Sequence, residues 1–269
     1  MILSKYFSKI GIKINQDFAF SKFMMCGGKS ATVFFPGCAF MKLGSGIIYK
    51  TLDLLRISEK DIMVCSLCCT YPSSVLDSGY NEKNINKLID FFTNRKVKKI
   101  YVACPNCFSK LNKIFSEYRL DIKVMMMYET ISQNLEKKNI QNSNVKEKIV
   151  IHDPCKIRND KRTHNAVRNI LDKIGQEYVE SEFAKENTLC CGNINMLHLL
   201  DIEKSNLMRK KCVDGLLKKS DYICSYCNGC LYAFEKENIR TIHLMELIFG
   251  KATSNKFYNR LKFTFQLLC

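Results

Sequence analysis

The segment Lys98-Lys-Ile-Tyr-Val-Ala-Cys-Pro-Asn-Cys107 runs from a short apolar stretch directly into a Cys-x-x-Cys pair. Three other apolar stretches end in the same way: residues 31–35 lead to Cys38, residues 148–151 to Cys155, and residues 221–223 to Cys224 and Cys227. Short apolar runs that are bounded by Pro or Gly and followed by helical patterns predict parallel strands covered on both faces. The sequence therefore predicts an α/β fold with cysteines at the carboxyl ends of its strands, where ligands collect in open α/β sheets.

Helical patterns alternate with these strands along the chain. We expect helices at residues 43–57, 81–93, 108–118, 165–174, 195–217 and 231–237. The least structured stretch, residues 136–148, is polar and charged and separates the two halves. On this basis we divide the chain into an N-terminal extension (1–30), a first repeat (31–142), a second repeat (143–250) and a basic C-terminal tail (251–269).

Ten of the fifteen cysteines form one pattern written twice: a lone Cys, an adjacent Cys-Cys pair and a Cys-x-x-Cys. The first copy is Cys38, Cys68, Cys69, Cys104 and Cys107, and the second is Cys155, Cys190, Cys191, Cys227 and Cys230. The lone Cys is followed by 29 and 34 residues before the pair, and the pair by 34 and 35 residues before the Cys-x-x-Cys. Scattered cysteines would not keep such spacing, so the pattern indicates an internal duplication, and the ten cysteines are our candidate metal ligands.

Five thiols in each half favour a multi-metal cluster over a single zinc ion. A structural zinc site takes four N or S ligands in a closed tetrahedron. Two adjacent cysteines must splay apart, which suits different atoms of a cluster, and cysteine thiolates are the usual ligands of iron–sulfur clusters. A cubane [4Fe–4S] cluster needs only four cysteines, so the fifth is either a redox-active thiol or a bridge in a non-cubane cluster. Spacing alone does not choose between these two.

The cysteine signatures resemble those of the cysteine-rich CCG domain family over residues 31 to 249. The matching motifs are Phe35-Pro-Gly-Cys38, Cys68-Cys69, Cys104-Pro-Asn-Cys107, His152-Asp-Pro-Cys155, Cys190-Cys191-Gly192 and Cys227-Asn-Gly-Cys230. The resemblance implies two pseudo-symmetric Rossmann-like halves with parallel sheets. In the heterodisulfide reductases of this family, five such cysteines in each half hold a non-cubane [4Fe–4S] cluster, and a disulfide is cleaved between the two clusters.

Two departures from the family pattern affect these expectations. Thr70 stands where the first Cys-Cys pair is usually followed by Gly, and it adds bulk where the backbone approaches the cluster. We therefore keep the alternative that only the second half binds a cluster. The chain also lacks the ferredoxin-type cysteine run that many relatives carry ahead of these domains, so the resemblance implies a separate electron-transfer partner that contains flavin or iron–sulfur.

We expect an iron–sulfur oxidoreductase subunit with two [4Fe–4S] clusters, either heterodisulfide reductase-like or serving a 2-hydroxy acid dehydrogenase partner. The clusters themselves would carry the catalysis, and we expect the protein to work under anaerobic conditions. The alternative is a non-catalytic zinc- or mixed-metal-binding interaction module, whose folding would depend on metal without redox activity. The sequence has no Gly-x-Gly-x-x-Gly loop, Walker A motif or Ser/His/Asp constellation.

The chain carries 42 Lys and Arg against 26 Asp and Glu, for a formal net charge of +16. The lysines are spread over its whole length, which is typical of a solvated surface or of a docking face for an acidic redox partner. We expect no nucleic-acid binding. The tail 251–269 combines cations with Phe and Leu and could dock weakly to a membrane surface or partner. Without a leader-like apolar run or a membrane span, we expect a cytoplasmic protein with reduced thiols.

Five cysteines and one histidine outside the pattern can each be explained by a structural role as well as by a functional one. Cys65 and Cys224 each precede a pattern cysteine by three residues. Each is either an alternative metal ligand or a buried small apolar residue, and the second role is the more common one for free cysteine. Cys26, Cys212 and Cys269 fit no spacing and are interpreted as structural. His152 either donates to a cluster sulfur or caps the local turn.

Overall fold

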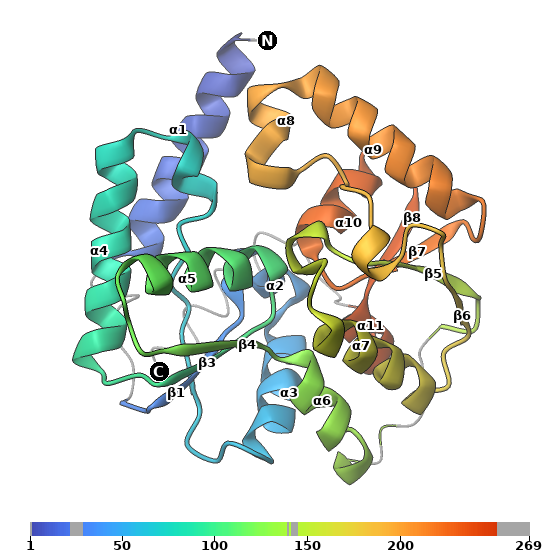
Figure 1. Cartoon of the computed structure of the whole chain (residues 1–269), viewed down its shortest axis with the longest axis horizontal. Coiled ribbons are helices and arrows are strands. Elements are labelled where there is room, and N and C mark those ends of the chain that lie inside the picture. The colour runs from blue at the N-terminus through green and yellow to red at the C-terminus, as the bar shows by residue number, and fades with distance from the viewer. Residues whose placement is uncertain (1, 22–28, 139, 141–144, 252–269) are drawn as a thin grey trace.

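The computed structural model describes residues 2–21, 29–138, 140 and 145–251 and contains two four-stranded sheets. The first has the order β2-β1-β3-β4 and the second β6-β5-β7-β8, and every neighbouring pair is parallel. The strands are β1 Thr32–Phe35, β2 Met63–Val64, β3 Lys99–Val102, β4 Lys123–Met126, β5 Ile149–His152, β6 Tyr178–Val179, β7 Tyr222–Ser225 and β8 Arg240–His243. The same order in each half confirms the prediction of two Rossmann-like halves, which lie side by side in Figure 1.

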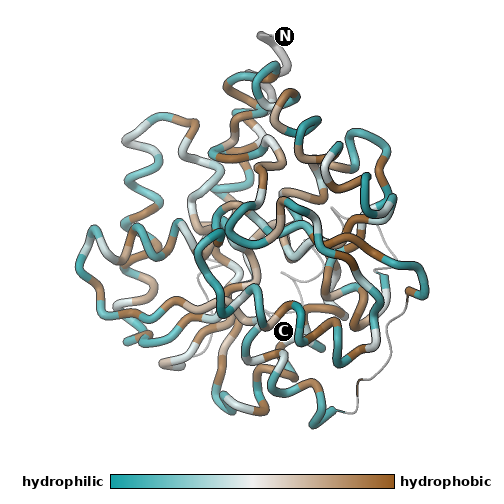
Figure 2. The backbone as a smooth tube through the Cα atoms, turned by 45° about the vertical axis from the view of Figure 1, so that its right-hand side comes forward, coloured by the Kyte–Doolittle hydropathy of each residue, from teal (hydrophilic) through white to brown (hydrophobic). Residues whose placement is uncertain are grey.

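The central strands are apolar because helices cover both of their faces. Val33, Phe34 and Phe35 of β1 are fully buried, and all four residues of β5 are buried. Continuous apolar runs of this kind are typical of parallel sheets. In Figure 2 most apolar (brown) segments lie inside the molecule, and most hydrophilic (teal) segments lie on outer helices and turns.

The larger helices follow the strands as predicted, with two differences. The helices are α1 Ile2–Ala19, α2 Gly37–Phe40, α3 Ser45–Arg56, α4 Ser78–Asn94, α5 Pro105–Glu117, α6 Tyr128–Asn134, α7 Lys161–Lys173, α8 Leu197–Leu200, α9 Ile202–Leu217, α10 Asn228–Glu235 and α11 Leu244–Phe249. The single helix predicted at 195–217 is wrong: Asp201 adopts an extended conformation (φ −143°) and caps α9 by accepting a hydrogen bond from the Lys204 N–H at 3.0 Å. Helix α1 was not predicted within the extension 1–30. None of the described helices is long and apolar enough to cross a membrane.

The larger of two clusters of buried apolar residues runs through both halves. It contains Phe34 and Ile131 from the first half together with Ile170 and Leu247 from the second. Helix α6 packs on α7, and α11 packs on α3, so each half contributes helices to the junction between the two sheets in Figure 1. At this junction the rings of Tyr128 and Tyr226 meet edge to face at 5.3 Å.

A buried histidine at the start of α11 predicts a pH-dependent stability. His243 is 1% exposed, and its Nδ1 accepts a hydrogen bond from the Met245 N–H at 3.1 Å. Burial lowers the pKa of His243 to about 3, against a smaller opposing effect of the Tyr226 backbone. In the unfolded chain a histidine titrates near pH 6.5, so the unfolded state takes up the proton first as the pH falls. The stability contributed by neutral His243 is complete above pH 6.5 and is lost between about pH 6.5 and pH 3.

We expect the free energy of unfolding to fall between pH 7 and pH 5 by about 2 kcal/mol through this residue. The variant His243→Asn keeps an acceptor at the helix start but does not titrate, so its dependence on pH is expected to be weaker by that amount. Urea unfolding of both proteins at the two pH values measures the difference. Parallel pH profiles for the two proteins would contradict the assignment to His243.

Candidate metal centre

The ten pattern cysteines lie at the carboxyl ends of the strands, as the sequence predicts. In the first half, Cys38 lies in α2 directly after β1, the Cys68-Cys69 pair follows β2, and Cys104 precedes α5, which contains Cys107. In the second half, Cys155 begins the short helix η4 (Cys155–Ile157) after β5, and Cys227 precedes α10, which contains Cys230. The pair Cys190-Cys191 lies in the loop before η6 (Ile194–Met196).

The first five thiols form a continuous row of hydrogen-bond contacts. Cys38 contacts Cys68, Cys68 contacts Cys69, Cys69 contacts Cys107, and Cys107 contacts Cys104. The Sγ atoms of Cys69 and Cys107 are 3.1 Å apart. Four of the five side chains are buried, and Cys38 is partly exposed.

The second five thiols repeat this order of contacts. Cys155 contacts Cys190, Cys190 contacts Cys191, Cys191 contacts Cys230, and Cys230 contacts Cys227. The two rows then meet, because Cys104 of the first half contacts Cys227 of the second. The structure thus brings all ten predicted ligands into one row with the same order of contacts in each direction from its centre.

The row cannot hold ten thiolates by itself. Hydrogen bonds from Cys107 and Cys68 lower the pKa of Cys69 to about 6, against the effect of burial. The contact with Cys38 lowers the pKa of Cys68, but the contact with Cys69 and burial outweigh it and raise the value to about 12. A thiol that ionises therefore keeps its neighbour protonated. Bound metal cations would remove this conflict, because coordination deprotonates thiols.

The surroundings of the row fit a sulfur-ligated metal centre. Gly37 has φ +76°, and a Cβ placed on it would lie 2.7 Å from the Cys107 Sγ, so the backbone passes directly against this thiol. Among the described residues, no three Cys, His, Asp or Glu side chains converge as ligands of one metal ion. The thiols instead follow one another in the continuous row described above.

The residue after each Cys-Cys pair has the same backbone conformation, although it is threonine at position 70 and glycine at position 192. Thr70 and Gly192 both have positive φ, 62° and 85°, and their N–H groups donate to the first thiol of the preceding pair, Cys68 and Cys190. A Cβ at Gly192 would lie 2.3 Å from the Ser205 carbonyl oxygen. Only glycine fits in the second half, whereas the first half accommodates threonine in a conformation that is strained for a β-branched residue.

Substitution of Gly192 tests how tightly the second pair is held. We expect Gly192→Ala to lower the free energy of unfolding by about 3 kcal/mol, since backbone strain and a clash with Ser205 add together. Gly250→Ala is the matched control: Gly250 has φ +86° with no atom within 4 Å of an added Cβ, so only strain of about 1 kcal/mol is expected. Chemical denaturation measures both variants, and equal losses would show that the close approach to Ser205 contributes nothing.

Three polar residues at the thiols escaped the sequence analysis. The Gln16 side-chain amide of α1 donates to the Cys68 Sγ at 2.8 Å, and the Asn106 amide lies 4.0 Å from the Cys227 Sγ. The Tyr71 hydroxyl accepts a hydrogen bond from the Asn195 N–H at 2.6 Å and so links the two halves. Asn106 and Tyr71 are close to pattern cysteines in sequence, which was a usable signal. Gln16 is 52 positions from its sulfur, and no local pattern indicates that contact.

Asp153 anchors the turn before Cys155 through a buried ion pair. Its carboxylate accepts two hydrogen bonds from the Arg168 guanidinium, at 2.5 and 2.7 Å, and one from the Tyr226 hydroxyl at 2.7 Å. Burial alone would raise the pKa of Asp153, but the hydrogen bonds and charge of Arg168, with Tyr226 and the Lys185 N–H, lower it to about 2. A fully buried carboxylate with this many donors holds its turn in one conformation.

The remaining cysteines and His152 lie beside the row. His152 is buried, with its Nδ1 3.7 Å from the Cys212 Sγ and its ring edge to face with Phe234. Within the described part of the chain, its Nε2 has no hydrogen-bond partner, so His152 does not donate to a pattern cysteine. Cys65 and Cys224 are 2% and 1% exposed, and burial raises the pKa of both, as expected of packing cysteines. Cys26, Cys269 and nearly all of the tail 251–269 lie outside the described residues.

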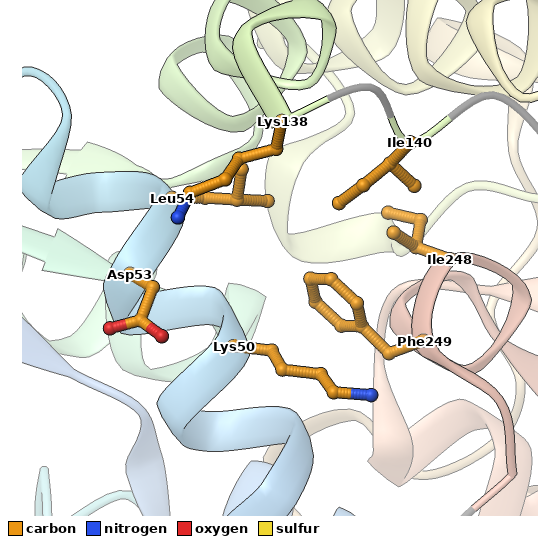
Figure 3. A pocket seen from close by; sticks show the side chains of 7 residues that line it. All are labelled: Lys50, Asp53, Leu54, Lys138, Ile140, Ile248 and Phe249. Carbon is orange, nitrogen blue, oxygen red and sulfur yellow. The ribbon is translucent and has the colours of Figure 1, made fainter.

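Two cavities differ in their relation to the row. One, of about 490 Å³, is lined by Cys38, Cys68 and Gln16. The other, of about 380 Å³ and shown in Figure 3, lies between α3 and α11, with Lys50 and Asp53 on one side and Ile248 and Phe249 on the other. None of the described cysteines lines the second cavity, so it is separate from the row of thiols.

The family model of the CCG cysteine-rich domain matches residues 32–112 and 149–235. The chain belongs to this family. Each matched segment contains one complete set of five thiols, so the duplication seen in the spacing is a duplication of the CCG domain.

Two curated relatives of this CCG protein are redox proteins by name. It is 24% identical over 166 residues to "EtfAB:quinone oxidoreductase" of Syntrophomonas wolfei, covering 59% of this chain and 23% of that protein. It is 22% identical over 178 residues to "Probable iron-sulfur-binding oxidoreductase FadF" of Bacillus subtilis, covering 62% of this chain and 25% of that protein. The chain thus spans about a quarter of the length of these relatives.

Solved structures offer only a weak likeness. Glutamate racemase RacE1 of Bacillus anthracis aligns with a TM-score of 0.35 and 13% identity over 81% of this chain and 77% of its own. Aspartate racemase of Picrophilus torridus aligns with a TM-score of 0.32 and 14% identity over 87% of this chain and 99% of its own. These values carry no inference about activity.

Proposed function

We propose that this CCG protein is an iron–sulfur subunit of an oxidoreductase and that its two thiol sets each hold one iron–sulfur cluster. The observation that carries the proposal is the row of ten cysteines with the same order of contacts in each half. The ligands would be Cys38, Cys68, Cys69, Cys104 and Cys107 for one cluster, and Cys155, Cys190, Cys191, Cys227 and Cys230 for the other. The name of the Bacillus subtilis relative, an iron-sulfur-binding oxidoreductase, supports the same chemistry.

When bound, iron–sulfur clusters accept and release single electrons. The chain's own residues would supply the conditions for this. Burial of most of the thiols keeps water away, and the N–H groups of Thr70 and Gly192 and the amides of Gln16 and Asn106 donate to sulfur. Hydrogen bonds to sulfur and low exposure are the means by which proteins adjust the potential of such centres.

We further propose a heterodisulfide reductase-like reaction, in which a disulfide and a thiol pair interconvert, with electrons supplied by a flavin- or iron–sulfur-containing partner in the cytoplasm. Service to a partner that oxidises a 2-hydroxy acid is the second candidate, and the spread positive charge would suit docking to an acidic partner in either case. Anaerobic co-purification from the source cells, followed by identification of the partner's cofactor, separates the two.

Metal analysis tests the cluster proposal directly. Protein purified without oxygen is expected to be brown and to contain about four irons and about four sulfides per thiol set, with paramagnetic resonance signals after reduction. Half of that iron in the unaltered protein, with no further loss when the first set is altered, would indicate that only the second half is loaded. Colourless protein with stoichiometric zinc would establish the alternative, a non-catalytic metal-binding interaction module.

A further inference from the structure

A cavity of about 650 Å³ opens between the two halves, and the described residues that line it include no cysteine. Its first wall is built from Tyr71, Ser109 and Lys110, and its second from Lys156 and Asn195. These residues lie on η2 (Pro72–Val75) and its flank, α5, η4 and η6, and the pairs η2–η6 and α5–η4 are in contact. The volume falls within the range of small-molecule sites, about 300 to 1,000 Å³.

The cavity has a strong excess of positive charge. Lys110, Lys113 and Lys156 line it, and its described lining residues include no Asp or Glu. Lys113 is offset in part by an exposed ion pair with Glu117 at 3.7 Å. Lys156 donates to the Asn195 side-chain oxygen at 2.9 Å, which positions the ammonium group without neutralising it.

The uncharged groups of the cavity also favour an acceptor-rich ligand. The Tyr71 oxygen already accepts the Asn195 N–H, so the hydroxyl hydrogen of this phenol is available for donation. Ser74 and Ser109 line the same space, but the Ser74 hydroxyl already donates to the Tyr71 carbonyl oxygen at 2.7 Å, so only Ser109 adds a second hydroxyl donor. Three ammonium groups and two hydroxyl donors along one concave space match a ligand with several anionic oxygens.

We propose that this cavity, which we call the inter-half cavity, binds a small multivalent oxyanion, either an organic phosphate or a polycarboxylate. Lys110 and Lys156 approach from different halves, so a ligand with two anionic groups can bind to both at once. The inference is independent of the redox proposal, since every group in it belongs to the chain and none is a metal ligand. A negative result for oxyanion binding would not contradict the iron–sulfur proposal, and a negative result for iron would not contradict oxyanion binding.

Binding of two probes to the as-purified protein tests the inference. Equilibrium dialysis with inorganic pyrophosphate and with citrate, at fixed ionic strength, is expected to show saturable binding of at least one, and the stronger of the two identifies phosphate or carboxylate as the preferred group. The double variant Lys110→Met/Lys156→Met is expected to weaken that binding at least tenfold. Lys113→Met is expected to weaken it less, because Glu117 already offsets this charge.

The matched control is Lys83→Met/Lys211→Met, which removes one exposed lysine from each half and the same total charge. It is expected to change the affinity less than twofold. Lysine modification followed by mass spectrometry repeats the test on the unaltered chain: the probe is expected to protect Lys110 and Lys156 but not Lys83 or Lys211. Equal losses in both double variants, uniform protection, or no saturable binding would overturn the proposal, the first two by showing general attraction to a chain of net charge +16.

Discussion

Replacing Cys69 and Cys107 together by serine is expected to halve the iron content of the anaerobic protein, from about eight to about four irons per chain. These two thiols are in direct contact at 3.1 Å in the middle of the first row, so their loss interrupts that set of ligands without touching the second. Metal analysis measures the iron, and paramagnetic resonance of the reduced protein is expected to lose one set of signals.

The corresponding change in the second half is Cys191→Ser/Cys230→Ser, which breaks the equivalent contact. It is expected to remove the other half of the iron and the other set of signals. Cys65→Ala is the control in the first half, since Cys65 is buried near the pair but belongs to neither row. Unchanged iron in either double variant would contradict the assignment of ligands. Complete loss from either one would show that the ten thiols hold a single joint centre.

Replacing Arg168 by methionine is expected to lower the free energy of unfolding by about 3 to 5 kcal/mol. The change leaves the Asp153 carboxylate fully buried with no charged partner, while the Tyr226 hydroxyl and the Lys185 N–H still donate to it. Denaturant unfolding measures the loss. The double variant Arg168→Met/Asp153→Asn is expected to recover part of it, because the unpaired charge is then removed.

Arg240→Met is the matched control for this ion pair. Arg240 pairs with Glu147 at 2.9 Å, but both side chains are about half exposed, so the loss of stability is expected to be far smaller than in Arg168→Met. Equally small losses in both variants would show that the turn before Cys155 does not depend on its buried ion pair. Because Asp153 lies two residues before Cys155, the iron content of Arg168→Met reports whether this turn also positions a ligand.

The sheets and the placement of the cysteines were predictable because both follow from short-range patterns. Runs such as 98–103 are largely apolar, which is typical of parallel strands, and the cysteines directly follow them in sequence. The break at Asp201 was not predicted, because the apolar pattern continues across it and only the capping hydrogen bond to Lys204 marks the start of the new helix. Helix α1 was missed for the opposite reason, since lysines interrupt its apolar positions.

The order of contacts within the rows depends on geometry that composition does not encode. Residues with positive φ follow each Cys-Cys pair, and this conformation lets an N–H group reach the first sulfur of the pair. Glycine at position 192 is compatible with a prediction of positive φ. Threonine at position 70 gives no such indication, because a β-branched residue rarely adopts positive φ. The Asp153–Arg168 pair was likewise hidden, since its members are separated by 15 positions that span a turn and the start of a helix.

The contact of Cys104 with Cys227 joins two equivalent positions of the duplicated unit. In a symmetric homodimer, a residue on the rotation axis meets its own copy in this way, and the interface is isologous. An ancestral single-repeat protein could therefore have assembled the same ten-cysteine arrangement by self-association. Gene fusion would then have made the pairing permanent and freed each half to diverge, as position 70 has from position 192.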